Sequence, residues 1–282
     1  MSYTMKDIAV FFDDSKAGKH LLEIAANLAH GQQAHLIGLT TAEIGGMTTP
    51  EDNFVRGEAM GELISKLQRS TMSHVLQVGK MLAEAAAKHD VSVEFRVLPF
   101  TELGSETTLH SLYCDLLIVS RPEAPGVPFF WSYSEVLTRT AVPILIVPYT
   151  WSSPIVARRI TVAWNASRQA RRAIADALPL LVNAEIVNLL VVDPERKPGQ
   201  HGEEPGADMA AYLARHDVHV EVNRVSSQGK SVAETIVSQA VEAGSDLIVF
   251  GAYSRPRFSE AVLGGVTREL LEDVSLPLFI SH

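Results

Sequence analysis

Glycine and hydroxyl residues near the carboxyl terminus have the order and spacing of a phosphate-binding loop. An apolar segment, expected to be a buried strand, leads to Gly251, and the loop after it reaches Gly264-Gly265-Val266-Thr267 at the start of a helical stretch. Glycine lets the backbone approach an anion closely, and the first N–H groups of a helix have no partner within the helix. Together with the helix dipole, these groups favour negative charge. This order of elements predicts a site for the phosphates of a ligand.

The elements that must position this loop occur twice along the chain. In each copy an apolar segment ends in an acid or an amide, Asp13 or Asn165, followed by a serine suited to cap the next helix, Ser15 or Ser167. Helical segments separate the apolar segments that follow. Each copy is expected to contain five strands: 8–13, 35–40, 91–98, 115–120 and 142–147 in the first, and 160–165, 186–192, 219–226, 246–251 and 276–281 in the second.

Apolar strands that alternate with helices predict an α/β fold, because such strands are buried on both faces of a parallel sheet. We expect two doubly wound five-stranded parallel sheets with right-handed crossovers, each in the strand order 3-2-1-4-5. A linker at 148–154, which contains two prolines and two serines, separates a first domain at 1–150 from a second at 155–282. A homodimer of whole chains is left open.

The expected topology and the glycine motif indicate the same place. In an open α/β sheet, ligands bind at the carboxyl ends of the strands where the strand order reverses. In the second copy the first strand ends at Ala163-Trp164-Asn165 and the fourth at Gly251. The crevice between these two strand ends therefore coincides with the beginning of the glycine-containing loop.

The spacing of the loop also resembles that of a known family. Gly251 is followed by two residues, Ser254, nine residues and Gly264-Gly265-Val266-Thr267. This is similar to the nucleotide-binding loop of the universal stress protein family, which has Gly, two residues, Gly, nine residues, Gly and then Ser or Thr. Ser254 replaces the second glycine and Gly265 the hydroxyl residue, while Thr267 offers a hydroxyl nearby. Because the similarity covers both copies, the chain resembles a tandem member with two adenine-nucleotide alpha-hydrolase-like (UspA) domains. The resemblance also implies that the fifth strands pair within the chain, as an intrachain pseudo-dimer.

The resemblance implies that the second domain binds ATP, or the related ADP or AMP. Gly251 would begin the loop where a side chain would collide with phosphate or ribose, and backbone N–H groups at 264–267 would bind phosphate oxygens. Asn165 matches the family's strand-1 aspartate, which contacts the nucleotide or its metal. Since an amide holds Mg²⁺ less well than a carboxylate, a role for Mg²⁺ is left open. The candidate binding residues are Ala163, Trp164, Asn165, Val191, Gly251, Ser254, Gly264, Gly265, Val266 and Thr267.

Three of these residues are expected near the adenine. Ala163 and Trp164 would border the ring, and Val191 would flank it through backbone groups. Trp164 fits a place in the core equally well. The Thr267 hydroxyl is as suited to capping the helix as to binding the ligand.

The first copy is expected to have lost the site. When the final helices and strands of the two copies are aligned, Phe130 and Trp131 fall opposite Gly264 and Gly265. The loop before them, 121–129, is shorter by three residues and contains three prolines, which lack an N–H donor. We therefore expect a nucleotide in the carboxyl-terminal domain only. The alternative is that the aromatic residues line a pocket for an apolar ligand.

The composition limits the partners and the compartment. The 282 residues are 46% hydrophobic and carry a net charge of −9, which argues against binding to nucleic acid or to an anionic membrane. No apolar run is long enough to span a bilayer, and the amino terminus lacks the profile of a signal peptide, so a cytoplasmic protein is expected. The single cysteine, Cys114, precedes an apolar strand and is expected to pack rather than react.

Two further segments carry structural predictions. Residues 228–231, Gln-Gly-Lys-Ser, are expected to form a turn and the start of a helix rather than a nucleotide-binding loop. Residues 50–89 have apolar positions near helical spacing and are expected to form one long helix or two. This helical segment would cover the first domain or contact a partner subunit.

These observations favour a binding module that holds ATP or a related adenine nucleotide and acts in the stress response through partner proteins. The sequence shows no plausible pair of nucleophile and base near the loop, so no catalytic residue and no metal ligand is assigned. Two alternatives are left open. One is a slow ATPase at the same site, and the other is an interaction scaffold that holds no nucleotide.

Overall fold

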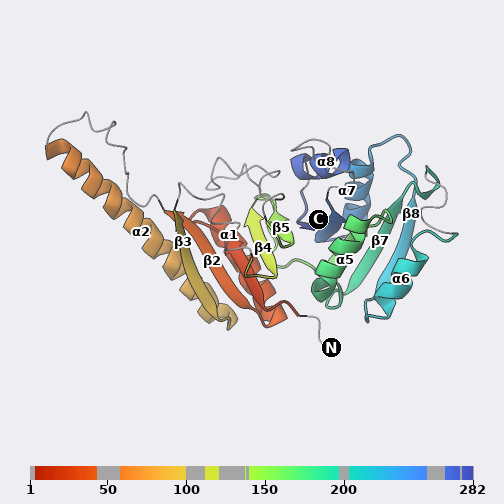
Figure 1. Ribbon diagram of the computed structural model, residues 1–282, viewed down its shortest axis with the longest axis horizontal. Coiled ribbons are helices and arrows are strands. Elements are labelled where there is room, and N and C mark those ends of the chain that lie inside the picture. Colours follow the sequence, from red (N-terminus) through yellow and green to blue (C-terminus); the bar gives the residue numbers. More distant parts are fainter. Residues whose placement is uncertain are drawn as a thin grey trace.

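The computed structural model describes residues 4–42, 58–99, 112–120, 137, 140–196, 203–252, 264–273 and 275–281, whose strands form a single sheet (Figure 1). The strands of the first half are β1 Asp7–Phe11, β2 His35–Ala42, β3 Val93–Pro99, β4 Leu116–Ser120 and β5 Ile144–Val147. Those of the second half are β6 Arg159–Ala163, β7 Ile186–Val192, β8 Val220–Val225, β9 Leu247–Gly251 and β10 Leu278–Ser281. The described helices include α1 Lys16–Gln32, α2 Glu58–His89, α5 Arg168–Leu181, α6 Ala207–Ala214, α7 Val232–Glu242 and α8 Gly265–Asp273.

The strand order confirms the expected topology in both halves. The sheet runs β3-β2-β1-β4-β5-β10-β9-β6-β7-β8, so each half has the order 3-2-1-4-5. Neighbouring strands within a half are parallel, whereas β5 and β10 are antiparallel, with Leu145 opposite Phe279 in the middle of the pair. The two expected sheets are therefore joined into one, and the expected pairing of the fifth strands within the chain is confirmed.

Helices cover both faces of this sheet, as expected for a doubly wound fold. Successive residues of a strand point to opposite faces. In β1, Ile8 and Val10 enter one apolar core, while Ala9 and Phe11 enter the other. The first core packs against α1, α2, α5 and α6, and the second packs against α7 and α8.

Serine side chains begin helices at the predicted positions. The Ser15 Oγ accepts the N–H of Gly18 at 3.0 Å at the start of α1, and the Ser167 Oγ accepts the equivalent N–H at 3.1 Å at the start of α5. Segment 228–231 is the predicted turn and helix start, since Ser231 caps α7. Each cap provides a partner for a backbone N–H that the helix itself cannot satisfy.

The long segment before β3 forms a single helix, α2, over its described part. Its buried residues Val78, Met81, Leu82 and Ala85 recur at helical spacing and pack on the first core. The helix contacts α1, β2 and β3 and extends beyond the ends of the strands (Figure 1). It has 32 residues, whereas α6, its counterpart in the second half, has 8. No described helix, α2 included, is long and apolar enough to cross a membrane.

Glu23 ties the end of α2 to α1. Its carboxylate accepts a hydrogen bond from the Lys88 ammonium group and lies 2.9 Å from Nε2 of His89. Burial alone would raise the pKa of Glu23, but the contacts with Lys88 and His89 outweigh it and lower the pKa. The charged carboxylate is therefore favoured in the folded state.

We expect Glu23→Gln to lower the free energy of unfolding by up to about 1 kcal/mol near neutral pH, since the three side chains are partly exposed. A carboxylate with a lowered folded pKa contributes stability above its unfolded pKa and loses it as the pH falls through the folded pKa. The difference between wild type and variant should shrink when urea unfolding is repeated from about pH 7 to about pH 3. A constant difference would contradict a role for the charge.

Candidate functional site

A pocket of about 110 Å³ opens at the carboxyl ends of β6 and β9, where the strand order of the second half reverses. Its lining is mostly apolar, and none of the lining residues in the described part of the chain carries a charge. They are Ala163, Trp164, Asn165, Ala170, Leu190, Val192, Val232, Ile236, Phe250, Gly251, Val266, Thr267 and Leu270. The pocket therefore lies where the topology predicted a crevice.

The structure brings most of the candidate residues to this pocket. Trp164 packs against the first core and also lines the pocket, and its contact with adenine stays a prediction. Gly264 and Gly265 lie at the start of α8, next to Val266, and Ser254 lies outside the described residues. The candidates that line the pocket are Ala163, Trp164, Asn165, Gly251, Val266 and Thr267.

Val191 is buried but does not line the pocket. The residues on either side of it, Leu190 and Val192, do so, because alternate residues of β7 face the same side of the sheet. The Val191 side chain instead lies near Gly206, which immediately precedes α6 on the other face. Its predicted role through backbone groups stays a prediction.

Three helices direct their amino termini toward the pocket. Ala170 lies in the first turn of α5, Val232 is the first residue of α7, and Val266 and Thr267 belong to the first turn of α8. The aligned peptide dipoles place about half a positive elementary charge at each helix start, where the first N–H groups lack helical partners. The pocket therefore combines apolar walls with a positive potential.

The sequence analysis did not identify the contribution of α7 to this site. The turn and serine cap at 228–231 predicted that a helix begins there, but nothing in their spacing indicates which strand end the helix faces. The apolar lining residues of the other helices and strands could not be identified from the sequence either, because their positions depend on how these elements pack on the sheet. The lining residues that were missed are Ala170, Leu190, Val192, Val232, Ile236, Phe250 and Leu270.

Gly251 is required by packing within the protein, which the sequence did not predict. A Cβ atom on Gly251 would lie 2.2 Å from the carbonyl carbon of Gln169 and 2.4 Å from the amide nitrogen of Ala170. Both are backbone atoms in the first turn of α5, so they cannot move without moving the helix. The expected reason for this glycine was a collision with phosphate or ribose. The close approach of β9 to α5 is a sufficient reason by itself, and it brings the amino terminus of α5 to the pocket.

Gly264 and Gly265 differ from Gly251, because no described contact requires glycine at either position. No described atom lies within 4 Å of a Cβ built on either residue. Neither residue has a φ in the left-handed region that favours glycine. The space beside the first turn of α8 is therefore open with respect to the described residues.

Asn165 and Asp13 make the same local turn in the two halves. Asn165 Oδ1 accepts the N–H of Ser167 at 3.2 Å, and Asp13 Oδ1 accepts the N–H and the hydroxyl of Ser15 at 3.0 and 2.6 Å. Each side-chain oxygen fixes the turn between strand and helix. The halves differ in charge at this position, because the first has a carboxylate and the second a neutral amide.

The predicted obstruction in the first half falls outside the described residues. This applies to Phe130, Trp131 and the loop 121–129. Ser120, which the repeat places opposite Gly251, ends β4 and is buried. The expectation of a single nucleotide site per chain stays a prediction.

Cys114 is buried, as expected from the sequence. Burial raises the pKa of its thiol to about 12, so the reactive thiolate is scarce at neutral pH. We expect dithionitrobenzoate to react with the native protein far more slowly than with protein unfolded in urea, which should release one equivalent of product. A rapid reaction of the native protein would show that the thiol is accessible and activated.

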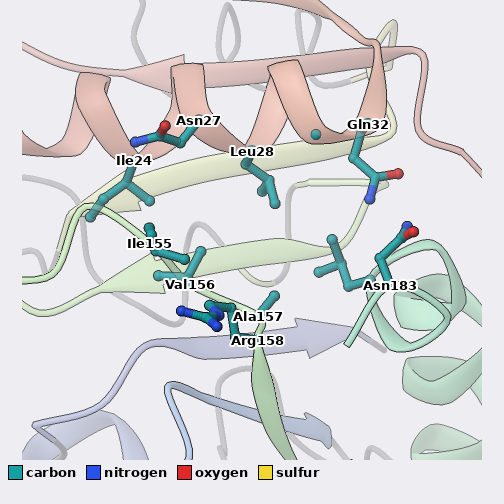
Figure 2. A pocket seen from close by; sticks show the side chains of 11 residues that line it. Ile24, Asn27, Leu28, Gln32, Ile155, Val156, Ala157, Arg158 and Asn183 are labelled. Atoms are coloured by element: carbon teal, nitrogen blue, oxygen red, sulfur yellow. The ribbon is translucent and has the colours of Figure 1, made fainter. Parts of the chain in front are cut away.

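A second cavity, of about 170 Å³, lies between the two halves at the other end of β6 (Figure 2). Side chains of α1, including Ile24, face residues 155–158 across it, and Asn183 borders it just beyond α5 (Figure 2). The Gln32 side chain reaches from the first half to the second, because its Nε2 donates a hydrogen bond to the Pro179 carbonyl at 3.0 Å. The cavity is thus part of the contact between the halves, and we give it no ligand.

Comparison with solved structures shows that the fold is shared. A universal stress protein from Archaeoglobus fulgidus DSM 4304 is similar over 97% of this chain and 97% of its own, with a TM-score of 0.65 and 15% identity. A protein of unknown function from Pseudomonas aeruginosa PAO1 is similar over 98% of this chain and 92% of its own, with a TM-score of 0.60 and 15% identity. No curated protein matches the sequence.

The half of the chain that contains the pocket also matches a known protein family in sequence. Residues 157–282 match the universal stress protein family. The match spans β6 to β10 and therefore includes all the residues that line the pocket. The half with the pocket is thus the part of the chain that resembles the universal stress protein family in sequence, and the half that precedes it has the same strand order.

Proposed function

We propose that the second half of this protein binds an adenine nucleotide, ATP or the related ADP or AMP, and that the protein acts in the stress response through partner proteins. One observation carries the proposal: the amino termini of α5, α7 and α8 converge on an apolar pocket whose described lining has no charged side chain. Such a pocket suits a ligand with a flat, weakly polar end and an anionic end.

The base would lie against the apolar walls at the strand ends. Ala163 and Phe250 provide walls from β6 and β9, Leu190 provides one from β7, and Ile236 covers them from α7. An apolar cavity of about 150 Å³ is known to hold benzene. The pocket, at about 110 Å³, is therefore too small to enclose a whole nucleotide. The ribose and the phosphates would extend beyond the cavity.

The phosphates would lie at the first turn of α8. Its first N–H groups have no helical partners, and the open space beside Gly264 and Gly265 allows a phosphate to approach the backbone. The loop spacing, which resembles the family's nucleotide-binding loop, supports an adenine nucleotide over another anion. The match of residues 157–282 to the universal stress protein family supports the same ligand.

The lining supports binding rather than turnover. Among the lining residues that the structure describes there is no aspartate, glutamate, histidine or lysine that could act as a general base. Phosphoryl transfer requires a positioned nucleophile in addition to the bound phosphates. The protein would therefore act as a nucleotide-holding module, and a slow ATPase is an outcome that the tests below can detect.

Val266→Glu tests the proposal with little risk to the fold. Val266 is 38% exposed, lines the pocket and lies in the first turn of α8. A carboxylate there stabilises a helix by about 0.3–1 kcal/mol, but it also repels an anionic ligand. The affinity for ATP or ADP in a calorimetric titration should fall at least about tenfold, while the thermal stability is kept. Val241→Glu, at a position of α7 that is 58% exposed, is the matched control and should bind as wild type does.

The alternatives give different results in the same set of assays. Nucleotide released from purified, denatured protein and identified by mass spectrometry would support the proposal. Absence of nucleotide, together with no binding on titration, would favour the interaction scaffold. Sustained release of phosphate with and without Mg²⁺ would favour an ATPase.

A further inference from the structure

We infer that the nucleotide in this pocket binds without a divalent cation, an inference that rests on the proposed function. A nucleotide polyphosphate in water commonly carries Mg²⁺, and proteins that bind the complex usually contribute one or two carboxylates to the metal. The donor groups at this pocket do not fit that role. They fit the free anion instead.

The internal repeat shows the difference at one position. Asp13 and Asn165 occupy the same place after the first strand of each half, and both use Oδ1 to fix the turn before the next helix. In Asp13 the remaining oxygen is a potential metal ligand. In Asn165 the corresponding atom is an amide nitrogen, which has no lone pair to offer to Mg²⁺.

Asp193, the residue after Val192, does not supply the missing carboxylate. Its Oδ1 accepts the N–H of Ser227 at 2.8 Å, and its Oδ2 lies 3.1 Å from Nε of Arg196. These contacts, the backbone hydrogen bond from Ser227 first, lower the pKa of Asp193. Oδ2 is buried without a hydrogen bond from the described residues, but the positive charge of Arg196 beside it disfavours a cation there, and Asp193 is not among the lining residues.

No other group of metal ligands occurs near the pocket in the described part of the chain. The described residues contain no cluster of three or more His, Cys, Asp or Glu side chains that could hold a metal ion.

The helix termini can replace the charge of the metal. Three helix starts, at about half an elementary charge each, supply roughly 1.5 positive charges around the pocket. These charges attract free ADP or ATP more strongly than the Mg²⁺ complex, in which the cation has already neutralised part of the phosphate charge. Excess Mg²⁺ should therefore weaken binding or leave it unchanged.

The test is a calorimetric titration of the full chain with ADP, once in EDTA and once in excess Mg²⁺. We expect binding in EDTA, with an affinity equal to that in Mg²⁺ or up to about tenfold higher. Asn165→Asp should lose at least about tenfold in EDTA, because its carboxylate repels the phosphates, and should recover in Mg²⁺. Asp13 shows that a carboxylate maintains the same turn, so this variant should fold.

Asn183→Asp makes the same chemical change at the other end of β6 and should match wild type in both buffers. Binding of ADP that requires Mg²⁺ in wild type would overturn the inference and leave the proposed function standing. An Asn165→Asp variant with the same affinity as wild type in EDTA would also overturn it. Absence of binding in both buffers would overturn the proposed function and this inference with it.

Discussion

Gly251→Ala is expected to lower the free energy of unfolding by about 3 kcal/mol or more, the upper end of the usual cost of overpacking. The added methyl carbon would lie 2.2 Å from the Gln169 carbonyl carbon and 2.5 Å from the Gln169 carbonyl oxygen. Such distances do not occur between unbonded atoms, and both atoms belong to the backbone of α5. The helix must therefore move away from β9, which separates parts of the second half. Urea unfolding followed by circular dichroism measures the loss.

Gly265→Ala is the matched control. The same methyl group would meet no described atom within 4 Å, and alanine is a better helix former than glycine. This variant should be as stable as wild type or up to about 1 kcal/mol more stable. Equal destabilisation of the two variants would show that the contact between β9 and α5 is not what requires Gly251.

Phe279→Ala is expected to cost about 3–5 kcal/mol, the usual range for a large side chain removed from a core. Phe279 is fully buried and lies opposite Leu145 in the antiparallel pair that joins β5 to β10. Its loss leaves a cavity in a core to which both halves contribute. We therefore expect lower hydrogen-exchange protection in β1 and β4 as well as in β6 and β9.

Val241→Ala, at an exposed position of α7, controls for the effect of truncation alone and should lie within about 0.5 kcal/mol of wild type. A loss of protection confined to β6–β10 would mean that the halves unfold independently. In that case the pairing of β5 with β10 would join two halves that unfold separately, rather than one cooperative unit.

Much of the fold could be predicted from the sequence because its signals are local and occur twice. The apolar segments ending at Asp13 and Asn165 each precede a serine that caps a helix, and this pattern sets the beginning of both halves. The strand order followed from the alternation of strands and helices, whereas the pairing of the fifth strands was implied by the family resemblance. Such features depend on periodicity and on short-range hydrogen bonds, which a single sequence records.

The parts that were missed depend on distances between elements. The sequence marked Gly251 as special but could not distinguish close packing on α5 from close approach to a ligand, since glycine serves both purposes. Leu190 and Val192 line the pocket while Val191 does not, and a shift of one residue along a strand is enough to reverse that choice. The start of α7 was predicted, but its direction toward the pocket follows from packing over the second core.

The short antiparallel contact between β5 and β10 has a consequence for how the two halves can change over time. Because one polypeptide carries both, their association survives any dilution and does not need a large contact area. In a homodimer formed through the same edge strand, every substitution would occur in both subunits, because the two chains have one sequence. A single chain is free of that symmetry, so Asp13 and Asn165 can diverge while each remains in its own half.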